Sequence, residues 1–247
     1  MKKELLVVAN WKMQFTHVES ILFLRRYLLL YEDLLFRSNI TLVLCPSFTI
    51  LTLVSSLGTR LVRWGAQNCS SQMRGAYTGD ISVLSLNDLE ITYAIVGHSE
   101  QRRYHCETDE SVACKADLLM DYSICPIVCV GETEQERDDK RTCEVLLLQL
   151  KAIKALMAKK PEASMIIAYE PLWAIGTERI PSVEELSKVY FSIAEYLDRA
   201  NNKVKILYGG SVSFATRELF AAIPLDGYLL GKQGCDGETL KKIILLW

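Results

Sequence analysis

The chain of 247 residues lacks the sequence features of several protein classes. It has no block of basic residues and its formal net charge is −2, so nucleic acid is not an expected partner. The opening stretch MKKELLVVANWKM turns polar too soon for a signal peptide. The leucine-rich segment around residues 27–31 is flanked by arginines and acids, so we expect no membrane-spanning helix and no membrane partner.

Cysteine patterns typical of metal sites are also missing. None of the eight cysteines forms a CxxC pair, and several lie in apolar runs such as CPIVCVG at residues 125–131. A reduced cysteine in such a run behaves as a small buried hydrophobic residue. We therefore expect the protein to work in the reducing cytoplasm.

The sequence does contain a series of short apolar runs separated by helix-like stretches. Half of the residues are hydrophobic, which is enough for a large core, and no linker or low-complexity segment divides the chain. The runs are apolar at both alternations, as in strands of a parallel sheet that is buried on two faces. They read LLVVAN, ITLVLCP, LVRWGAQN, ITYAIVGH, CPIVCVG, MIIAYEP, KVKILYGG and LDGYLLG.

The stretches between these runs carry helix signals. Residues 17–37 place leucines at three- and four-residue spacings, and residues 109–122 open with acids. Residues 182–202 begin with Ser182, and Glu185 follows three positions later, which is the pattern of a capping box. Eight strand–helix units in about 250 residues favour an α/β fold of the (β/α)₈ barrel type over an open sheet. We expect residues 1–247 to form one such barrel as a single domain.

In a barrel of this type the chemistry lies at the carboxyl ends of the strands. One lysine, one histidine and several carboxylates occupy those positions, together with glycine-rich turns. This combination suggests acid–base chemistry on a small anionic substrate. The strand ends read Asn10-Trp11-Lys12, Gln67-Asn68, His98-Ser99-Glu100, Gly131-Glu132-Thr133, Glu170-Pro171, Gly209-Gly210-Ser211 and Gly231-Lys232.

These motifs, in this order, resemble those of the triosephosphate isomerase family. The resemblance covers essentially the whole chain, through ANWKM (9–13), AQN (66–68), GAYTGDIS (75–82), VGHSE (96–100), CVGET (129–133), AYEPLWAIGT (168–177), YGGSV (208–212) and DGYLLG (226–231). It implies an enzyme of glycolysis and gluconeogenesis that interconverts dihydroxyacetone phosphate and D-glyceraldehyde 3-phosphate through an enediolate. It implies no cofactor and no metal.

The resemblance also assigns the chemistry to individual residues. Glu170 is the expected base for a carbon-bound proton, and exclusion of water is expected to raise its pKa. His98 is the expected electrophile, kept neutral in this family by the start of a helix. Lys12 stabilises negative charge, with Glu100 as the expected partner of its ammonium group, and Asn10 adds a hydrogen bond to the substrate.

A lid and a phosphate grip complete the expected site. In the family, residues 171–177 close over the substrate and shield the enediolate from water. Backbone N–H groups at Gly176, Ser211, Gly231 and Lys232 are expected to bind the phosphate, because such groups can form an anion nest. The expected supporting and lid positions are Glu100, Pro171, Trp173, Ile175, Thr177, Tyr208 and Leu229.

The sequence departs from the family pattern at three places. Gln101 stands where an arginine usually follows the glutamate of the histidine motif, and Glu178 follows Thr177 where a glycine is usual. Lys232 replaces a glycine in the last phosphate turn, and a lysine adopts φ > 0 less readily than a glycine. We expect its side chain to point outward, away from the phosphate. These departures affect the lid and the phosphate grip and leave the chemical roles in place.

The family resemblance further implies a homodimer. Residues 69–80 form a long loop that, in the family, enters a pocket of the neighbouring subunit, with Thr78 near the partner's active site. Two other functions stay open on the sequence alone. One is a Schiff-base aldolase, although no strand between residues 91 and 210 places a lysine at its centre. The other is a binding protein that kept the barrel without its activity.

Overall fold

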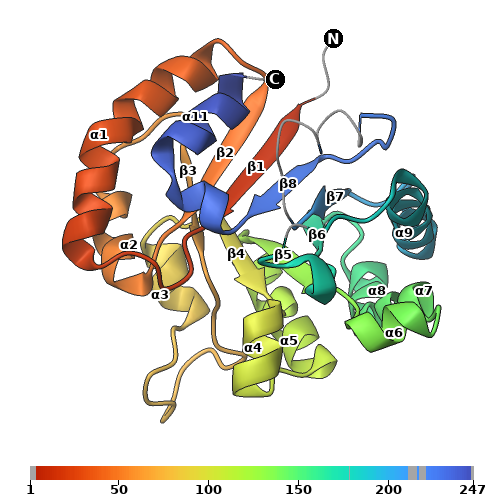
Figure 1. Ribbon diagram of the computed structural model, residues 1–247. Helices are drawn as coiled ribbons and strands as arrows, with labels where there is room; N and C mark the ends of the chain where they lie inside the picture. Colours follow the sequence, from red (N-terminus) through yellow and green to blue (C-terminus); the bar gives the residue numbers. More distant parts are fainter. Residues whose placement is uncertain (1–3, 178, 211–215, 217–220, 246–247) are drawn as a thin grey trace.

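A computed structural model describes residues 4–177, 179–210, 216 and 221–245. Within this part of the chain, eight parallel strands pair in chain order and close into a barrel, as Figure 1 shows. The predicted (β/α)₈ fold is therefore confirmed. The strands are β1 (Leu5–Asn10), β2 (Ile40–Cys45), β3 (Arg63–Ala66), β4 (Tyr93–Val96), β5 (Cys125–Val130), β6 (Met165–Tyr169), β7 (Val204–Tyr208) and β8 (Gly227–Leu230).

The strands are buried on both faces, as their apolar patterns predict. Along β1, Leu6 and Val8 point into the barrel and join an inner cluster with residues such as Ile95 and Ile127. The alternate residues of β1, Val7 and Ala9, join a separate outer core beneath the helices. Alternate residues along the strands therefore fill the barrel, and the chemical groups are confined to its rim.

Helices surround the barrel on the outside (Figure 1). No described helix is both long and apolar enough to cross a membrane. The described helices are α1 (His17–Phe36), α2 (Phe48–Ser55), α3 (Val83–Asp88), α4 (Ser99–His105), α5 (Asp109–Asp121), α6 (Glu134–Asp138), α7 (Thr142–Gln149), α8 (Lys151–Lys159), α9 (Val183–Tyr196) and α11 (Gly237–Leu245), with short 3₁₀ turns η1 (Leu172–Ala174) and η2 (Lys232–Cys235).

The helix that follows the lid starts where the sequence predicts and ends earlier. Ser182 accepts the backbone N–H of Glu185, and the Glu185 side chain accepts the backbone N–H of Ser182, so the capping box of α9 is confirmed. The helix ends at Tyr196, not near residue 202. Asp198 adopts a left-handed conformation, with φ of 48°, and its carboxylate accepts the side-chain amide of Asn201. These local bonds replace a further helical turn.

Candidate active site

A cavity of about 350 Å³ opens at the carboxyl ends of the strands. It brings together residues from five segments of the chain that are far apart in sequence. Most of the predicted site residues are among its lining: Asn10, Lys12, Gln14, His98, Glu100, Glu170, Ile175, Gly176, Thr177, Gly209, Gly210, Leu229, Gly231, Lys232 and Gln233. Two positions singled out in the sequence, Ser211 and Glu178, lie outside the described residues.

His98 is positioned by the start of α4, as the sequence predicts. It follows β4 as the N-cap of that helix, and its Nδ1 accepts the backbone N–H of Glu100 at 3.2 Å. A ring nitrogen that accepts a hydrogen bond carries no proton, so the neutral ring carries its proton on Nε2. Nε2 lies 3.5 Å from Oε1 of Glu170, which is longer than an ordinary hydrogen bond.

Glu170 is a buried carboxylate at the end of β6. Its Oε2 and the Nε2 of His98 are both buried, and neither has a hydrogen-bond partner within the described part of the chain. Buried polar atoms are normally bonded, so two such atoms on one cavity are suited to a polar ligand. Glycines make room for this glutamate. A Cβ at Gly209 would lie 2.6 Å from Cγ of Glu170, and one at Gly131 would lie 1.9 Å from its carbonyl oxygen.

The two buried groups shift each other's pKa. Burial acts to raise the pKa of Glu170, but the facing His98 and, more weakly, Lys12 outweigh it, so this pKa lies below its ordinary value. Burial acts to lower the pKa of His98, and the Glu170 carboxylate outweighs it, so this pKa lies above its ordinary value. Desolvation therefore acts on the pKa of Glu170 in the expected direction, but in the site without substrate the imidazole beside the carboxylate outweighs it.

Lys12 is held in place through both its backbone and its side chain. It has a left-handed backbone with φ of 50°, which costs energy for a residue other than glycine. Its N–H donates to Oδ1 of Asn10, and its carbonyl accepts the side-chain amide of Gln67 at 2.8 Å. The Nζ donates to Glu100 at 2.9 Å, which is the predicted partner. Gln67 was noted only as a strand end, and the sequence gives no signal of this bond.

The lid segment is internally bonded in the structure. After Pro171, residues 172–174 form the short turn η1. The hydroxyl of Thr177 donates to the carbonyl of Trp173 and accepts the backbone N–H of Arg179, so the two ends of the lid are tied together. Ile175 lies at the lid tip and lines the cavity together with the buried Leu229.

Glu132, which the sequence marks only as part of a strand end, is buried and bonds the start of the segment expected to form the lid. Glu132 follows β5, and its Oε1 accepts the indole N–H of Trp173 at 2.8 Å and the hydroxyl of Tyr169 at 3.0 Å. Burial raises the pKa of this carboxyl, and the two hydrogen bonds offset part of that effect. Two guanidinium groups contact the same indole ring, at 4.1 Å for Arg137 and 5.1 Å for Arg179.

Glycines lie on the side of the cavity where the phosphate is expected. Gly176 has φ of 70°, which favours glycine at the lid tip. Gly231 precedes η2, and a Cβ there would lie only 3.5 Å from the side chain of Lys12. Lys232 begins η2 without a positive φ, so the strain considered for a lysine in this turn does not arise. Its side chain is exposed at the cavity edge. Tyr208 is buried, and its hydroxyl packs against Gly210.

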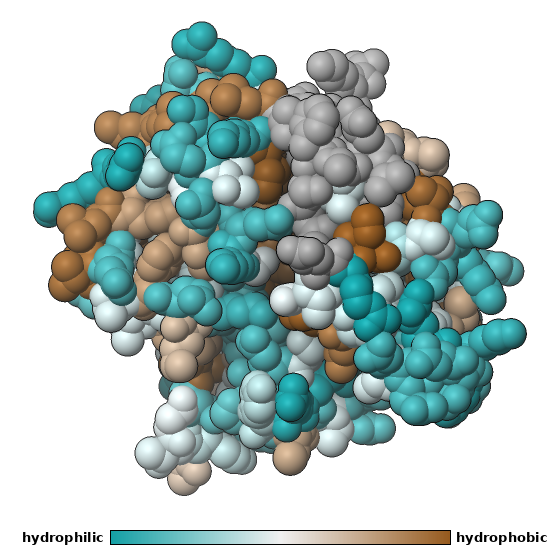
Figure 2. Space-filling model, viewed as in Figure 1, coloured by the Kyte–Doolittle hydropathy of each residue, from teal (hydrophilic) through white to brown (hydrophobic). Residues whose placement is uncertain are grey.

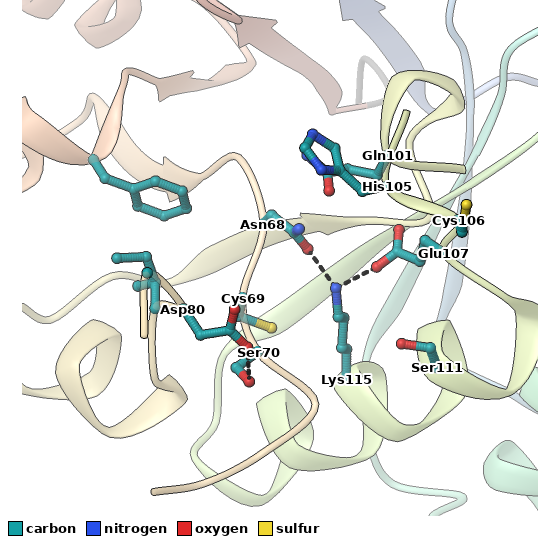
Figure 3. A pocket seen from close by; sticks show the side chains of 13 residues that line it. Asn68, Cys69, Ser70, Asp80, Gln101, His105, Cys106, Glu107, Ser111 and Lys115 are labelled. Atoms are coloured by element: carbon teal, nitrogen blue, oxygen red, sulfur yellow. Dashed lines mark hydrogen bonds and ion pairs between the residues drawn. The ribbon is translucent and has the colours of Figure 1, made fainter. Parts of the chain in front are cut away.

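The two ends of the long loop at residues 67–82 are held by hydrogen bonds and an ion pair. Figure 3 shows Lys115 between Asn68 and Glu107, and its Nζ bonds both. Ser70 donates to Asp80 at 2.6 Å, and its backbone N–H bonds the carbonyl of Ile81. The loop from residue 72 to residue 80 is exposed along its whole length. It therefore projects from a fixed base.

Comparisons with known proteins agree with this geometry. The sequence model of the family described as triosephosphate isomerase matches residues 5–246. The chain belongs to the triosephosphate isomerase family. It is 39% identical to the triosephosphate isomerase of Streptomyces coelicolor over 249 residues, covering 97% of this chain and 96% of that protein. It is 36% identical to that of Endomicrobium trichonymphae, covering 97% of each chain, and 38% identical to that of Hahella chejuensis, covering 83% and 85%.

Membership of the triosephosphate isomerase family confirms the resemblance seen in the motifs and makes this protein an isomerase. The aldolase alternative also loses support from the structure. Lys205 lies near the amino end of β7, away from the rim that carries the site, and its Nζ pairs with Glu4 at 3.0 Å. It is therefore not placed for a Schiff base with a substrate in the cavity.

Proposed function

We propose that this protein interconverts dihydroxyacetone phosphate and D-glyceraldehyde 3-phosphate. The observation that carries the proposal is the pair of buried, unbonded atoms on one cavity, Nε2 of His98 and Oε2 of Glu170, with the ammonium group of Lys12 on the same wall. One atom is a donor, one is a basic acceptor, and the third group supplies positive charge. Proton transfer next to a carbonyl needs these three functions.

In the proposed mechanism, Glu170 removes a proton from the carbon next to the substrate carbonyl. His98 donates the proton on Nε2 in a hydrogen bond to the carbonyl oxygen, where negative charge develops. Lys12 stabilises the same charge, and Asn10 adds a hydrogen bond. The proton on Nε2 passes to that oxygen, and Nε2 takes up the hydroxyl proton of the neighbouring carbon, so the carbonyl and the hydroxyl exchange places. Glu170 returns a proton to the other carbon, and the aldose and the ketose interconvert with no net change in atoms or electrons.

Substrate binding offers a reason why Glu170 becomes a better base. In the unliganded site its pKa is held low by the imidazole of His98. A bound substrate accepts a hydrogen bond from Nε2 and draws the imidazole away from the carboxylate, which weakens that effect. Ile175 and Leu229 then cover the carboxylate with hydrocarbon when the lid closes, and loss of water raises the pKa of a carboxyl group. Both changes strengthen the base at the moment of reaction.

The substrate phosphate is bound, in this proposal, by backbone N–H groups of Gly176, Ser211, Gly231 and Lys232. Glycine allows the backbone to approach an anion closely, and the positive φ of Gly176 fits that role. Pro171 and Trp173 form the first hinge, and Thr177 ties the second hinge to it. The closed lid shields the enediolate from water, which prevents loss of phosphate.

We further propose that the whole chain is one catalytic domain and acts as a homodimer. The exposed loop of residues 72–80, on its pinned base, is suited to insertion into a neighbouring subunit. Thr78 would then contact Asn10, Lys12 and Glu100 of that subunit and support their geometry from outside the barrel. A cytoplasmic location is also proposed, and all eight cysteines are unpaired, which suits a reducing compartment.

An isomerase assay without added cofactor or metal tests the proposal. Wild type is expected to convert glyceraldehyde 3-phosphate, whereas Glu170→Ala is expected to lose almost all activity and still bind phosphate. Glu162→Ala removes a carboxylate of an exposed ion pair and serves as a control that retains full activity. An inactive wild type that binds triose phosphate would indicate a binding protein, and a borohydride-trapped adduct would indicate an aldolase.

A further inference from the structure

Helix α1 carries a row of large apolar side chains on its outer surface. Leu22, Leu29 and Phe36 are 58%, 82% and 81% exposed. They are spaced seven residues apart, so they lie along one stripe of the helix, as in the repeat of a coiled coil. Figure 2 shows hydrophobic surface along the edge of the molecule that α1 occupies in Figure 1.

The inner face of α1 does not need these residues. That face already buries Phe23, Leu24, Tyr27, Tyr31 and Leu35, and the helix packs against α2, α11 and β2. Single exposed hydrophobic residues are normal on protein surfaces. Three large exposed apolar residues aligned on one stripe of a helix are different, because aligned apolar surface of this kind marks interaction sites.

The charges beside the row identify what fits against it. Arg25 lies four residues before Leu29, and Asp33 lies four residues after it, both exposed and on the same stripe. Leu22 and Phe36 lie seven residues before and after Leu29. The apolar and charged residues of the stripe are therefore spaced equally before and after Leu29. The charged residue before Leu29 is positive and the one after it is negative.

We propose that α1 packs antiparallel against α1 of a second copy of this chain, about a two-fold axis through Leu29. Leu29 then meets Leu29 of the second copy, Leu22 meets Phe36, and Arg25 meets Asp33, twice by symmetry. A parallel pairing would place Arg25 against Arg25, with like charges opposed. The antiparallel arrangement is thus the one in which both the apolar and the charged side chains find partners.

Neighbouring charges leave this pairing possible. Asp33 also accepts Arg37 of its own helix at 3.1 Å, so in the pair it would bridge two guanidinium groups. The two-fold axis would also place Glu32 opposite Arg26 of the second copy. Glu32 already accepts the backbone N–H groups of residues 60–62, so the pairing does not depend on a contact between Glu32 and Arg26. The stripe lies away from the loop of residues 67–82 in Figure 1, so this contact is separate from the dimer proposed above.

A pair of 20-residue helices is about 30 Å long and buries less than the roughly 800 Å² per partner of a standard interface. We therefore expect association that depends on concentration, and its first step doubles the mass of the basic assembly. Sedimentation velocity over a concentration series measures it. Leu29→Glu is expected to abolish the doubling, since two carboxylates would then meet on the axis. Phe191→Glu changes an equally apolar exposed residue on α9 and is expected to leave the doubling intact.

Charge reversal tests the register. Arg25→Asp and Asp33→Arg should each weaken association, because each variant places like charges opposite one another. An equimolar mixture of the two variants should recover it, because the introduced aspartate of one copy then faces the introduced arginine of the other. Circular dichroism and isomerase activity should stay at wild-type levels, since none of these residues lines the cavity.

Four results would overturn the proposal. The wild type never doubles in mass, or the Leu29→Glu variant still doubles. The mixture of the two charge variants associates as weakly as each variant alone, or the stripe binds neutral lipid vesicles and does not self-associate.

Discussion

At the scale of single residues, the site depends on where two buried side chains lie relative to each other. His98 and Glu170 come from the ends of β4 and β6 and approach to 3.5 Å without a normal hydrogen bond. The distance leaves each side chain available for a substrate atom. The positions of both residues follow from the strand-end rule, and their separation does not follow from the sequence.

The first prediction concerns the length of the base. Glu170→Asp should keep the fold and lose most of the activity, because it withdraws the carboxylate by about 1 Å, and a misplacement of that size costs roughly 10²-fold. Steady-state kinetics measures kcat, and thermal unfolding checks the fold. A kcat close to that of wild type would show that Glu170 is not the base.

The second prediction concerns the pKa of His98 in the free enzyme. Because Glu170 raises this pKa above the ordinary value of about 6.5, Glu170→Gln should lower it, and burial should then carry it below that value. Nitrogen NMR of the three histidines against pH measures the change. The exposed His17 and His105 lie outside the cavity and give reference signals in the same spectra.

The sign of this shift also determines the expected activity profile. As pH falls through the raised pKa, His98 becomes a cation and loses the neutral form that the mechanism uses. The kcat/KM of wild type should therefore decline on the acid side of that pKa. A pKa of His98 that is the same in wild type and in Glu170→Gln would contradict the coupling of the two side chains.

Some residues of the site could be predicted from the sequence, and others could not. The pairing of Lys12 with Glu100 followed from the cost of an unpaired buried lysine. The roles of Gln67, Gly209 and Glu132 depend on contacts between strands that are distant in sequence, and no local pattern reports those contacts. Burial does act to raise the pKa of Glu170, as expected, but the net direction in the site without substrate depends on the imidazole beside the carboxylate, which the sequence does not show.

At the scale of elements, the segment proposed as the lid is tied to the body of the molecule through Arg179. The guanidinium of Arg179 pairs with Glu134 at the start of α6 and lies over the ring of Trp173, so it connects the two ends of that segment. Both the pair and the ring contact are specific arrangements that a shorter or neutral side chain cannot reproduce.

The third prediction is that Arg179→Ala loosens the lid. The exposed ion pair contributes on the order of 1 kcal/mol or less to stability, so the unfolding temperature should change little. The kcat/KM should fall several-fold, because a loose lid holds the phosphate less well. Lys203→Ala removes a comparable exposed pair with Glu162, away from the lid, and should change neither quantity. Equal effects of the two substitutions would argue against a link between Arg179 and the lid.

The elements themselves were largely predictable because their signals are local. The capping box at Ser182 and the acids that open α5 fixed two helix starts. The early end of α9 was not predictable from its apolar periodicity. It rests on the left-handed Asp198 and its bond to Asn201, and the side chain of the following Arg199 bonds the carbonyl of Val204 and the carboxylate of Asp226.

At the scale of the whole molecule, the closed barrel explains why chemistry gathers at one rim. The strands are packed on their inner and outer faces, so polar functions gather at the last residue of a strand, such as Asn10, and just beyond it. The alternation of apolar runs with helices was sufficient to predict this architecture. The assembly of subunits depends on surfaces, and a single chain does not report how they are covered.

The fourth prediction concerns the homodimer. Replacing Tyr77 and Thr78 at the exposed loop tip by aspartate should shift the protein towards monomers and reduce kcat, because Lys12 and Glu100 of the neighbour lose their support. Light scattering gives the mass, and kinetics at matched concentration gives the activity. Aspartates at Leu148 and Phe191, which are equally exposed on α7 and α9, are the control pair. A monomeric wild type with full activity would contradict the proposed role of the loop.

The most direct test of the account is the isotope content of the product when the reaction runs in D₂O. If Glu170 takes a proton from carbon and returns it to the neighbouring carbon, part of the transferred hydrogen exchanges with solvent on the carboxyl group. Glyceraldehyde 3-phosphate formed from dihydroxyacetone phosphate should then carry deuterium at C2, and Glu170→Ala should form almost no deuterated product. A wild-type product without any deuterium, or unchanged deuterium incorporation by Glu170→Ala, would contradict the account.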